Sequence, residues 1–468
     1  MNFQFVVAGR KKASHDILPV INPYNGKEFA ETYKAQEADI EEAVAKSVEL
    51  FEKTRRMSSM ERAQALVKTA DNLESKKEEF AEIIAREAGK PIRFSRIEVD
   101  RAVSTFRIAA EEAKRIKGEV LPVDIVPSGI GRTAVIKRFP IGPVLGITPF
   151  NFPLMLVAHK VAPAIASGNP VIIKPASKTP LSALMLGFAV LSAGWEAISV
   201  LPCSSELAEK MVADDRIKLL TFTGSDTVGW ALKAKSGKKK VALELGGNAA
   251  VIVHKDADIE DAAKKCVTGG FSYSGQVCIS VQRIYVHTDI YDEFKNKIKC
   301  ETEKLKTGDP MDENTDISAL IDSANLERVK DWVDEAVKEG GRIISGGNST
   351  GSVYEPTIME NVPQKCAVVS KEVFGPVIVL EGYDDFDKAL DKVNDSRFGL
   401  QAGVFTNDIR LIMKSFDQID AGGVIINNVS AFRIDSMPYG GVKDSGLGRE
   451  GPRWAIEEMT EPKIMILS

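Results

Sequence analysis

Cys278 and Glu244 are the residues of this chain whose types and surroundings best suit nucleophilic chemistry. Cys278 lies in the segment 271–280, Phe-Ser-Tyr-Ser-Gly-Gln-Val-Cys-Ile-Ser, and Glu244 lies in the segment 243–248, Leu-Glu-Leu-Gly-Gly-Asn. A thiol attacks as its thiolate, and an ordinary pKa of about 8.5 leaves only a small ionised fraction at neutral pH. A nearby carboxylate can take the thiol proton, or activate a water that hydrolyses a thioester. By itself this pair is weak evidence, because a lone cysteine is more often a small buried apolar residue.

Other segments of the chain complete a pattern around this pair. An Asn stands between prolines and aromatic residues, a Lys ends an apolar stretch, and glycine-containing turns follow. The segments are 147–153 (Ile-Thr-Pro-Phe-Asn-Phe-Pro), 171–177 (Val-Ile-Ile-Lys-Pro-Ala-Ser), 221–225 (Thr-Phe-Thr-Gly-Ser), 372–376 (Glu-Val-Phe-Gly-Pro) and 438–450 (Pro-Tyr-Gly-Gly-Val-Lys-Asp-Ser-Gly-Leu-Gly-Arg-Glu). In this order and spacing they closely resemble the aldehyde dehydrogenase superfamily, from about residue 18 to the C-terminus.

The resemblance implies a catalytic set of Cys278, Glu244, Asn151 and Lys174. Cys278 would attack the aldehyde carbon and form a thiohemiacetal. Hydride would then leave for a nicotinamide ring, and water would release the acid from the resulting thioester. Glu244 would be the base for the thiol or the water. Asn151 would donate its side-chain amide to the developing oxyanion, together with the backbone N–H of Cys278; removing one such donor generally costs about 10²–10³-fold in rate.

The resemblance also implies a bound dinucleotide. Lys174, at the end of a strand, would hydrogen-bond the cofactor ribose. Gly224 and Ser225 mark a turn from strand to helix, where backbone N–H groups favour phosphate. Glu372 would hold the ribose beside the nicotinamide, with Phe374 near that ring. The full set of implied cofactor residues is Ile147, Thr148, Pro149, Phe150, Lys174, Ser177, Lys178, Gly224, Ser225, Leu245, Glu372 and Phe374.

Ser177 bears on the choice between the two nicotinamide cofactors. Members of the superfamily that favour NAD often place a Glu at this position, where it accepts both hydroxyls of the adenosine ribose. A carboxylate there would repel a 2′-phosphate, whereas Ser177 cannot, and Lys178 follows directly. We therefore expect the protein to use NADP or NAD, with NADP slightly favoured.

Two basic residues are candidates for contact with the substrate. Arg101 lies on a helix that often borders the substrate tunnel in relatives, and Arg433 falls in the loop before the segment 438–450. Either could face a carboxylate or phosphate, and the alternative is structural pairing with Asp100 or Asp435. These residues favour a small polar aldehyde, with lactaldehyde, phosphonoacetaldehyde, glyceraldehyde-3-phosphate and succinic semialdehyde all open.

The composition excludes several other classes of protein. The 468 residues include 61 basic and 66 acidic side chains, a net charge of −5, which argues against nucleic-acid binding. Five scattered cysteines without CxxC spacing favour a reducing compartment and no disulfide framework, and with four histidines they predict no metal site. The most apolar stretch, 150–173, is broken by prolines, His and Lys, so it predicts a buried helix and strand and no membrane span. We expect a cytoplasmic protein.

The elements that must position these residues follow two patterns. Apolar residues at three- and four-residue spacing predict helices across 37–117, and the segment 133–139 reads as a strand. Strands and helices alternate from 142 to 245 and again from 249 to about 428, the βαβ rhythm of parallel sheets with helices on both faces. The predicted fold class is therefore α/β, with two doubly wound parallel-sheet domains.

The resemblance supplies the boundaries between these parts. It implies a dinucleotide-binding domain of residues 1–117 and 141–245, and a catalytic domain of residues 246–435. A small β element of residues 118–140 and 449–468 would pair subunits, because these apolar strands need partners. We expect a homodimer or homotetramer.

Two other functions are open at this point. A CoA-acylating aldehyde dehydrogenase would share the nucleophile, but acylating members of the superfamily generally lack a carboxylate like Glu244. A non-catalytic structural or binding protein could share the scaffold, because folds do not determine function. Such proteins usually lose the nucleophile or the base, and this chain has both.

Overall fold

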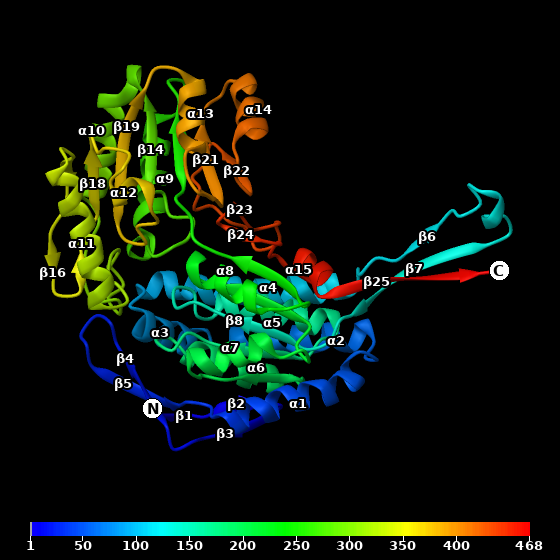
Figure 1. The fold of residues 1–468 in the computed structure, drawn as a ribbon. Coiled ribbons are helices and arrows are strands. Elements are labelled where there is room, and N and C mark those ends of the chain that lie inside the picture. Colours follow the sequence, from blue (N-terminus) through cyan, green and yellow to red (C-terminus); the bar gives the residue numbers. More distant parts are fainter. Residues whose placement is uncertain (1) are drawn as a thin grey trace.

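The computed structural model describes residues 2–468, and at its centre lies an eight-stranded sheet (Figure 1). The inner strands run parallel to one another, and short antiparallel strands extend both edges. The spatial order is β24 (Gly446–Leu447), β12 (Lys240–Glu244), β11 (Leu219–Thr223), β8 (Val144–Ile147), β9 (Val171–Lys174), β10 (Ile198–Val200), β2 (Phe5–Val7) and β3 (Arg10–Lys12).

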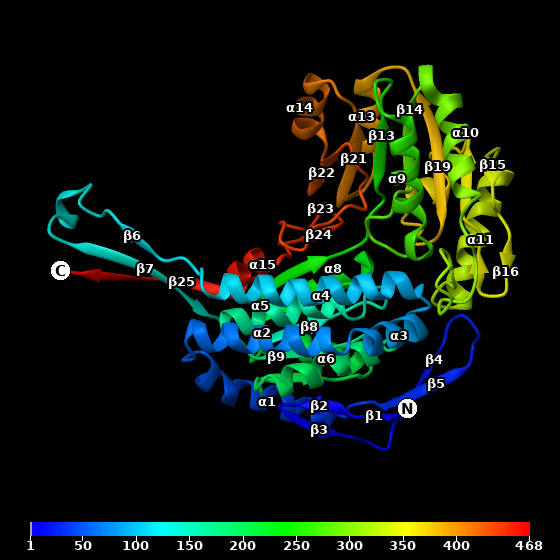
Figure 2. The same cartoon turned by 180° about the vertical axis from the view of Figure 1, so that it is seen from behind.

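Helices cover both faces of this sheet, as Figures 1 and 2 show from opposite sides. On one face, α5 (Met155–Ser167) and α6 (Leu181–Ser192) pack on the strands, with α2 (Ser59–Ser75), α3 (Lys77–Ala88) and α4 (Ile92–Ala113) outside them. On the other face lie α1 (Glu37–Thr54), α7 (Ser205–Ala213) and α8 (Asp226–Lys235). The helices predicted across 37–117 and the α/β fold class are thereby confirmed.

The predicted buried helix and strand within 150–173 are also confirmed. Every residue of α5 is buried, because the helix lies between the sheet and an outer layer of helices. It ends at Gly168, whose φ of 87° is the left-handed conformation typical of a helix C-cap. No helix within residues 2–468 is long and apolar enough to cross a membrane.

A second large sheet is built from the later part of the chain. Its strands are parallel except β15, which runs antiparallel to β18 at one edge. The spatial order is β15 (Arg342–Ser345), β18 (Thr357–Glu360), β19 (Val377–Tyr383), β14 (Arg283–His287), β13 (Ala250–Val253), β21 (Gln401–Phe405) and β22 (Gly423–Ile426). Its helices are α9 (Ile259–Phe271), α10 (Tyr291–Thr302), α11 (Ser323–Lys338), α12 (Ala367–Ser370), α13 (Phe386–Asn394) and α14 (Ile409–Gln418).

A long arm extends away from both sheets (Figure 1). It is a three-stranded sheet of β25 (Thr460–Leu467), β7 (Thr133–Pro140) and β6 (Glu119–Leu121), in that order. The strand predicted at 133–139 is thus confirmed, and its partner is the C-terminal strand. The helix α15 (Pro452–Glu458) packs instead on α4 and α5, so of residues 449–468 the arm contains only the part from Thr460 onward.

The N-terminal strands had no counterpart among the predicted elements. The strands β2 and β3 extend the eight-stranded sheet, and a separate three-stranded sheet has the order β1 (Asn2–Phe3), β5 (Glu28–Tyr33) and β4 (Ile17–Ile21). Smaller elements complete the fold: the pairs β16 (Ser349–Thr350) with β17 (Val353–Tyr354) and β20 (Phe398–Gly399) with β23 (Val442–Lys443), and the 3₁₀ turns η1 (Pro127–Gly129), η2 (Ser272–Gly275) and η3 (Thr288–Ile290).

Candidate active site

One cavity of about 1070 Å³ is lined by the catalytic, cofactor and substrate residues predicted from the sequence. Four parallel neighbours in the central sheet, β8, β9, β11 and β12, end at its wall, which is where α/β folds usually bind ligands. The predicted residues that line this cavity are Arg101, Ile147, Thr148, Pro149, Phe150, Asn151, Lys174, Ser177, Lys178, Gly224, Ser225, Glu244, Leu245, Cys278, Glu372, Phe374 and Arg433. The fold therefore brings all of them together, although they come from distant parts of the sequence.

The segment before Cys278 has an unusual backbone. Tyr273 and Ser274 have φ angles of 49° and 54°, and Gly275 follows with 69°, so three consecutive residues are left-handed. Side-chain bonds hold this conformation: the Tyr273 hydroxyl donates to the carbonyl of Ala88 at 2.8 Å, and Ser274 Oγ donates to that of Ser318 at 2.8 Å. Strain of this kind persists only where surrounding contacts impose it, and it is typical of functional sites.

Two glycines leave room for this segment. A Cβ atom on Gly275 would lie 2.1 Å from the carbonyl oxygen of Gly375, and one on Gly247 would lie 2.2 Å from that of Cys278. Real side chains do not approach backbone so closely, so any substitution at either position must displace the Cys278 segment. These glycines set backbone geometry around the thiol.

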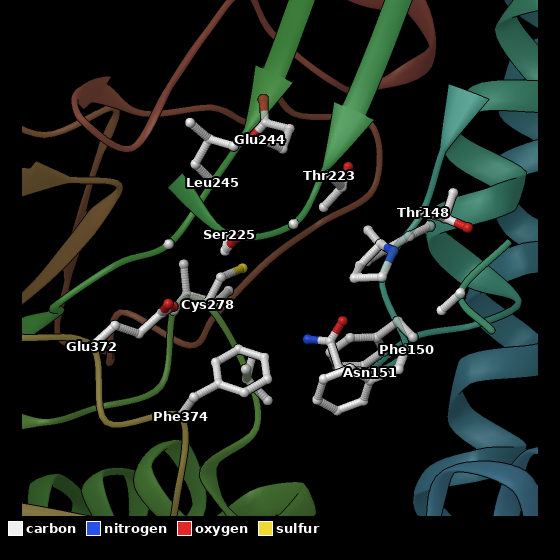
Figure 3. A pocket seen from close by; sticks show the side chains of 18 of the residues that line it. Thr148, Phe150, Asn151, Thr223, Ser225, Glu244, Leu245, Cys278, Glu372 and Phe374 are labelled. Atoms are coloured by element: carbon white, nitrogen blue, oxygen red, sulfur yellow. The ribbon is translucent and has the colours of Figure 1, made fainter. Parts of the chain in front are cut away.

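Cys278 presents its thiol to the cavity, between Glu244 on one side and Asn151 on the other (Figure 3). Burial, with a smaller contribution from the neighbouring Glu372, raises the pKa of the thiol to about 12, although the Tyr439 hydroxyl, 3.0 Å from Sγ, lowers it in part. The thiol of the isolated chain is therefore protonated at neutral pH. Its ionisation needs a proton acceptor and groups that stabilise the anion.

Glu244 ends β12 and lines the same cavity (Figure 3). Its side chain is buried, and Oε2 has no hydrogen-bond partner among residues 2–468. Burial raises the pKa of Glu244 well above its usual range, and the nearby carboxylate of Glu450 adds to this. A carboxylate with a raised pKa and a free oxygen is suited to accept a proton near neutral pH.

Asn151 is buried at the opposite wall of the cavity. Its Nδ2 atom donates to the carbonyl of Gln276 at 2.9 Å, which leaves the second N–H of the amide free. The backbone N–H of Cys278 likewise has no hydrogen-bond acceptor in the described part of the chain. Asn151 is thus tied to the backbone two residues before Cys278, and each residue keeps a donor for an oxyanion.

The other half of the cavity has the features that a dinucleotide requires. The ten-residue helix α8 begins at the cavity wall, and its N-cap Ser225 makes no side-chain capping bond, so its first N–H groups are available to phosphate. Lys174 ends β9, and burial lowers its pKa. Thr148 contributes a buried Oγ1 without a partner within residues 2–468. Unpaired donors and acceptors along one wall fit a polar ligand.

Glu372 and two aromatic residues, Phe374 and Phe150, line this part of the cavity (Figure 3). Glu372 Oε1 accepts from the backbone N–H of Gly247 at 3.0 Å, and burial raises the pKa of its carboxyl to about 7. The rings of Phe150 and Phe374 meet edge to face with centroids 5.7 Å apart. A carboxylate beside two aromatic faces suits a ribose that carries a flat ring.

Ser177 and Lys178 lie at the far end of the groove, and both are exposed. Lys178 forms an ion pair with Asp322, so its charge is partly matched within the chain. Ser177 is uncharged, so it does not repel the 2′-phosphate of NADP as a carboxylate at this position would.

The two arginines proposed for substrate contact are both engaged by carboxylates. Arg101 binds Asp435 through Nε and one terminal nitrogen at 3.0 and 2.7 Å, while its helix neighbour Asp100 pairs with Lys77. About a quarter of the Arg101 side chain is exposed, and its other terminal nitrogen has no hydrogen-bond partner among residues 2–468. Arg101 therefore pairs with Asp435, and the terminal nitrogen that makes no hydrogen bond is the part of the guanidinium left for a ligand in the cavity.

Arg433 is enclosed much more completely. Its side chain is only 5% exposed, and a terminal nitrogen lies 3.2 Å from Glu450 and 3.2 Å from His159. Its guanidinium also stacks over the ring of Tyr439 at 3.7 Å. Arg433 has far less surface to offer a substrate than Arg101 has.

Comparison with known proteins decides the family of this chain. The model of the aldehyde dehydrogenase family matches residues 10–465. The chain belongs to the aldehyde dehydrogenase family. It is 49% identical to a 3-sulfolactaldehyde dehydrogenase of Priestia aryabhattai over 99% of this chain and 97% of that one.

Solved structures of aldehyde dehydrogenases superimpose closely. Aldehyde dehydrogenase 21 from Physcomitrella patens, in complex with the reaction product succinate, matches with a TM-score of 0.98 and 42% identity, covering 100% of this chain and 98% of that one. Glyceraldehyde-3-phosphate dehydrogenase GapN from Methanocaldococcus jannaschii, complexed with NADP, matches with a TM-score of 0.93 and 38% identity, covering 96% and 99%. The chain is therefore an oxidoreductase that acts on aldehydes and uses NAD or NADP.

Several cavity residues of this aldehyde dehydrogenase were not singled out from the sequence. Tyr439 lies in the motif 438–450, so its position in the sequence could have marked it, but no role was assigned to it. The helix α11 contributes three residues that carry no motif and that only the fold brings to the cofactor side: Asn325, Arg328 and Trp332.

Proposed function

We propose that this aldehyde dehydrogenase oxidises a small polar aldehyde to its carboxylic acid through a thiohemiacetal and a thioester on Cys278. The observation that carries the proposal is the meeting of three groups in one cavity: the thiol, the free carboxylate oxygen of Glu244 and the free amide donor of Asn151. These are the nucleophile, base and oxyanion donor that acyl chemistry requires.

Each residue has a distinct part in the proposed reaction. Cys278 loses its proton, directly or through water, to Glu244, and its sulfur bonds to the aldehyde carbon. The free N–H of Asn151 and the N–H of Cys278 donate to the oxygen of that carbon as it becomes negative. When bound, NAD or NADP accepts hydride from the carbon. Glu244 first releases the thiol proton to solvent. It then takes a proton from the water that attacks the thioester and passes it to the departing sulfur, so the carboxylic acid leaves and the thiol is regenerated.

The proposed cofactor site follows the free polar groups of the groove. Lys174 would hold a ribose, the N-terminus of α8 at Gly224 and Ser225 would hold phosphate, and Glu372 would hold the second ribose. The presence of Glu244 favours water over CoA as the acyl acceptor, because a positioned base serves hydrolysis.

Ser177 gives a test of cofactor preference. We expect Ser177→Glu to lower kcat/KM for NADP by about tenfold or more while that for NAD is kept, because the added carboxylate repels the 2′-phosphate. Steady-state kinetics with both cofactors measure this. Ser177→Gln is the matched uncharged control and should keep NADP. A wild-type preference for NAD of more than about tenfold would contradict the idea.

An anionic substituent on the substrate would bind the open edge of Arg101. The relative from Priestia is named for 3-sulfolactaldehyde, a three-carbon aldehyde with a sulfonate. Arg101 lines the cavity with a free terminal nitrogen, and guanidinium groups bind such anions through paired N–H bonds. We propose a short aldehyde with an anionic or hydroxyl group, and 3-sulfolactaldehyde is the first compound to assay.

Substitution of Arg101 tests whether it binds the anionic group of the substrate or only stabilises the fold. Arg101→Met should raise KM for 3-sulfolactaldehyde by about 10- to 100-fold, because a charge-assisted contact is lost, and should leave propanal almost unaffected. Arg101→Lys is the control for loss of the ion pair, because lysine can still pair with the buried carboxylate of Asp435. An equal loss of kcat/KM with propanal would show that Arg101 acts on the fold and not on the anion. Better turnover of long aliphatic aldehydes would contradict the substrate class.

The arm supports a further part of the proposal, a homodimer or homotetramer. Its C-terminal strand exposes about half of each of Ile464, Met465, Ile466 and Leu467, and open strands with apolar surface seek partners. Light scattering on Ile464→Asp/Ile466→Asp should report a smaller assembly than wild type, because the two charges lie on one face of the strand. Lys463→Ala is the control, and a wild-type monomer would contradict the proposal.

A further inference from the structure

Tyr439 is the side chain that approaches the Cys278 sulfur most directly. Its hydroxyl oxygen lies 3.0 Å from Sγ, within hydrogen-bond range for sulfur. Tyr439 is 3% exposed, and its backbone is paired with that of Glu450, whose N–H donates at 2.6 Å and whose carbonyl accepts at 3.1 Å. The contact thus belongs to a segment whose backbone is held by hydrogen bonds on both sides of Tyr439.

The direction of this hydrogen bond depends on the charge of the sulfur. A neutral thiol can donate to the phenol oxygen, but a thiolate only accepts, so the hydroxyl must then be the donor. Burial raises the pKa of Tyr439 well above its usual range, and the neighbouring Cys278 adds to this, so the phenol keeps its proton. Tyr439 is therefore able to donate whenever Cys278 is ionised.

Arg433 strengthens this donor from the other side of the ring. Its guanidinium lies 3.7 Å from the ring centroid, and the ion pair with Glu450 holds it there. A cation over an aromatic face is attracted to it, and in a buried site its field also favours a nearby anion. Arg433 thus serves the sulfur through Tyr439 without an exposed surface of its own.

We propose that Tyr439 is a further catalytic residue, whose hydroxyl donates a hydrogen bond to the Cys278 thiolate with Arg433 stacked behind it. The proton that leaves Sγ goes to Glu244 or to water, while Tyr439 keeps its own, so no bond of the phenol breaks. The hydrogen bond is released as the sulfur bonds to the aldehyde carbon. This inference rests on the proposed function only for the role of the sulfur as nucleophile.

The test is the pH dependence of thiol alkylation, without aldehyde or cofactor. Iodoacetamide reacts with the thiolate, and mass spectrometry of the peptide that contains Cys278 reports the rate at that sulfur alone. Tyr439→Phe should raise the apparent thiol pKa by about one unit and slow alkylation near neutral pH about tenfold, because a charge-assisted hydrogen bond is lost. A larger reagent, N-ethylmaleimide, should slow by the same factor, because the loss lies in the fraction of thiolate and not in access of the reagent to the sulfur.

Control variants separate this effect from a change of fold. Tyr285→Phe removes another buried hydroxyl, one bonded to Arg283 at 3.1 Å, and should leave the alkylation profile unchanged. Tyr439→His retains a ring N–H donor and should give a pKa between those of wild type and Tyr439→Phe. If Tyr439→Phe does not fold, as judged by thermal unfolding, Tyr439→His is compared with Tyr439→Leu.

Each outcome distinguishes this inference from the proposed function. An alkylation profile of Tyr439→Phe that coincides with wild type overturns the role of Tyr439, even if Cys278 is essential for turnover. A loss of rate that depends on the size of the reagent also overturns it, because that would show a packing role only. Full aldehyde oxidation by a Cys278→Ala variant would overturn the proposed function, while the alkylation data would still report the hydrogen bond.

Discussion

Cys278→Ala is expected to lower aldehyde oxidation by about 10⁴-fold or more, because the covalent path through the sulfur disappears. Binding of NADP should be kept, since the groove formed by Lys174, Ser225 and Glu372 does not depend on the thiol. Spectroscopic assay of reduced cofactor gives the rate, and fluorescence titration gives the affinity for the cofactor.

The chain offers a matched control for this variant. Cys300 is exposed on α10 and does not line the cavity, so Cys300→Ala should retain full activity. Aldehyde oxidation by Cys278→Ala at the wild-type rate would show that another group is the nucleophile.

Glu244→Gln is expected to stop the cycle at a different point. Glutamine keeps the shape of the side chain but cannot accept a proton, so hydrolysis of the thioester should slow by about 10²–10⁴-fold. If the thiol can still lose its proton to water, one equivalent of reduced cofactor should form quickly before turnover slows. Stopped-flow absorbance measures this burst, and the exposed Glu303→Gln is the control. A rate of steady turnover equal to that of wild type would rule out Glu244 as the base.

The raised pKa of Glu244 also predicts the shape of the pH profile. The base works only when deprotonated, so kcat should fall as pH drops through this pKa. An ordinary glutamate has a pKa of about 4.3. Because burial and Glu450 raise the pKa of Glu244, kcat should begin to fall at a higher pH than it would with an ordinary glutamate. In Glu244→Gln this acid limb should disappear.

Most of the candidate site could be predicted because its residues lie in short contiguous motifs. Lys174 and Glu244 end β9 and β12, Asn151 lies in the proline-containing segment after β8, and Cys278 follows a glycine-containing turn; local sequence determines the backbone at each place. The alternation of strands and helices likewise follows from local periodicity, so the α/β class and the helices of 37–117 were predictable.

The contacts that could not be predicted join distant segments. The sequence left open whether Arg101 pairs with Asp100 or Asp435. It pairs with Asp435, and Asp100 pairs with Lys77, because adjacent residues on a helix point in different directions. The hydrogen bond between Tyr439 and Cys278 joins residues that are 161 positions apart in the sequence. The N-terminal strand β2 is short and acquires its partner, β10, only in the folded chain.

Covalent catalysis by Cys278 is tested most directly by the mass of the Cys278 peptide after a single turnover. Glu244→Gln is mixed with aldehyde and NADP, quenched during the burst and digested for mass spectrometry. The account predicts that this peptide gains the mass of the acyl group in proportion to the reduced cofactor formed. Reduced cofactor with an unmodified Cys278, or an acyl group on another residue, would contradict it.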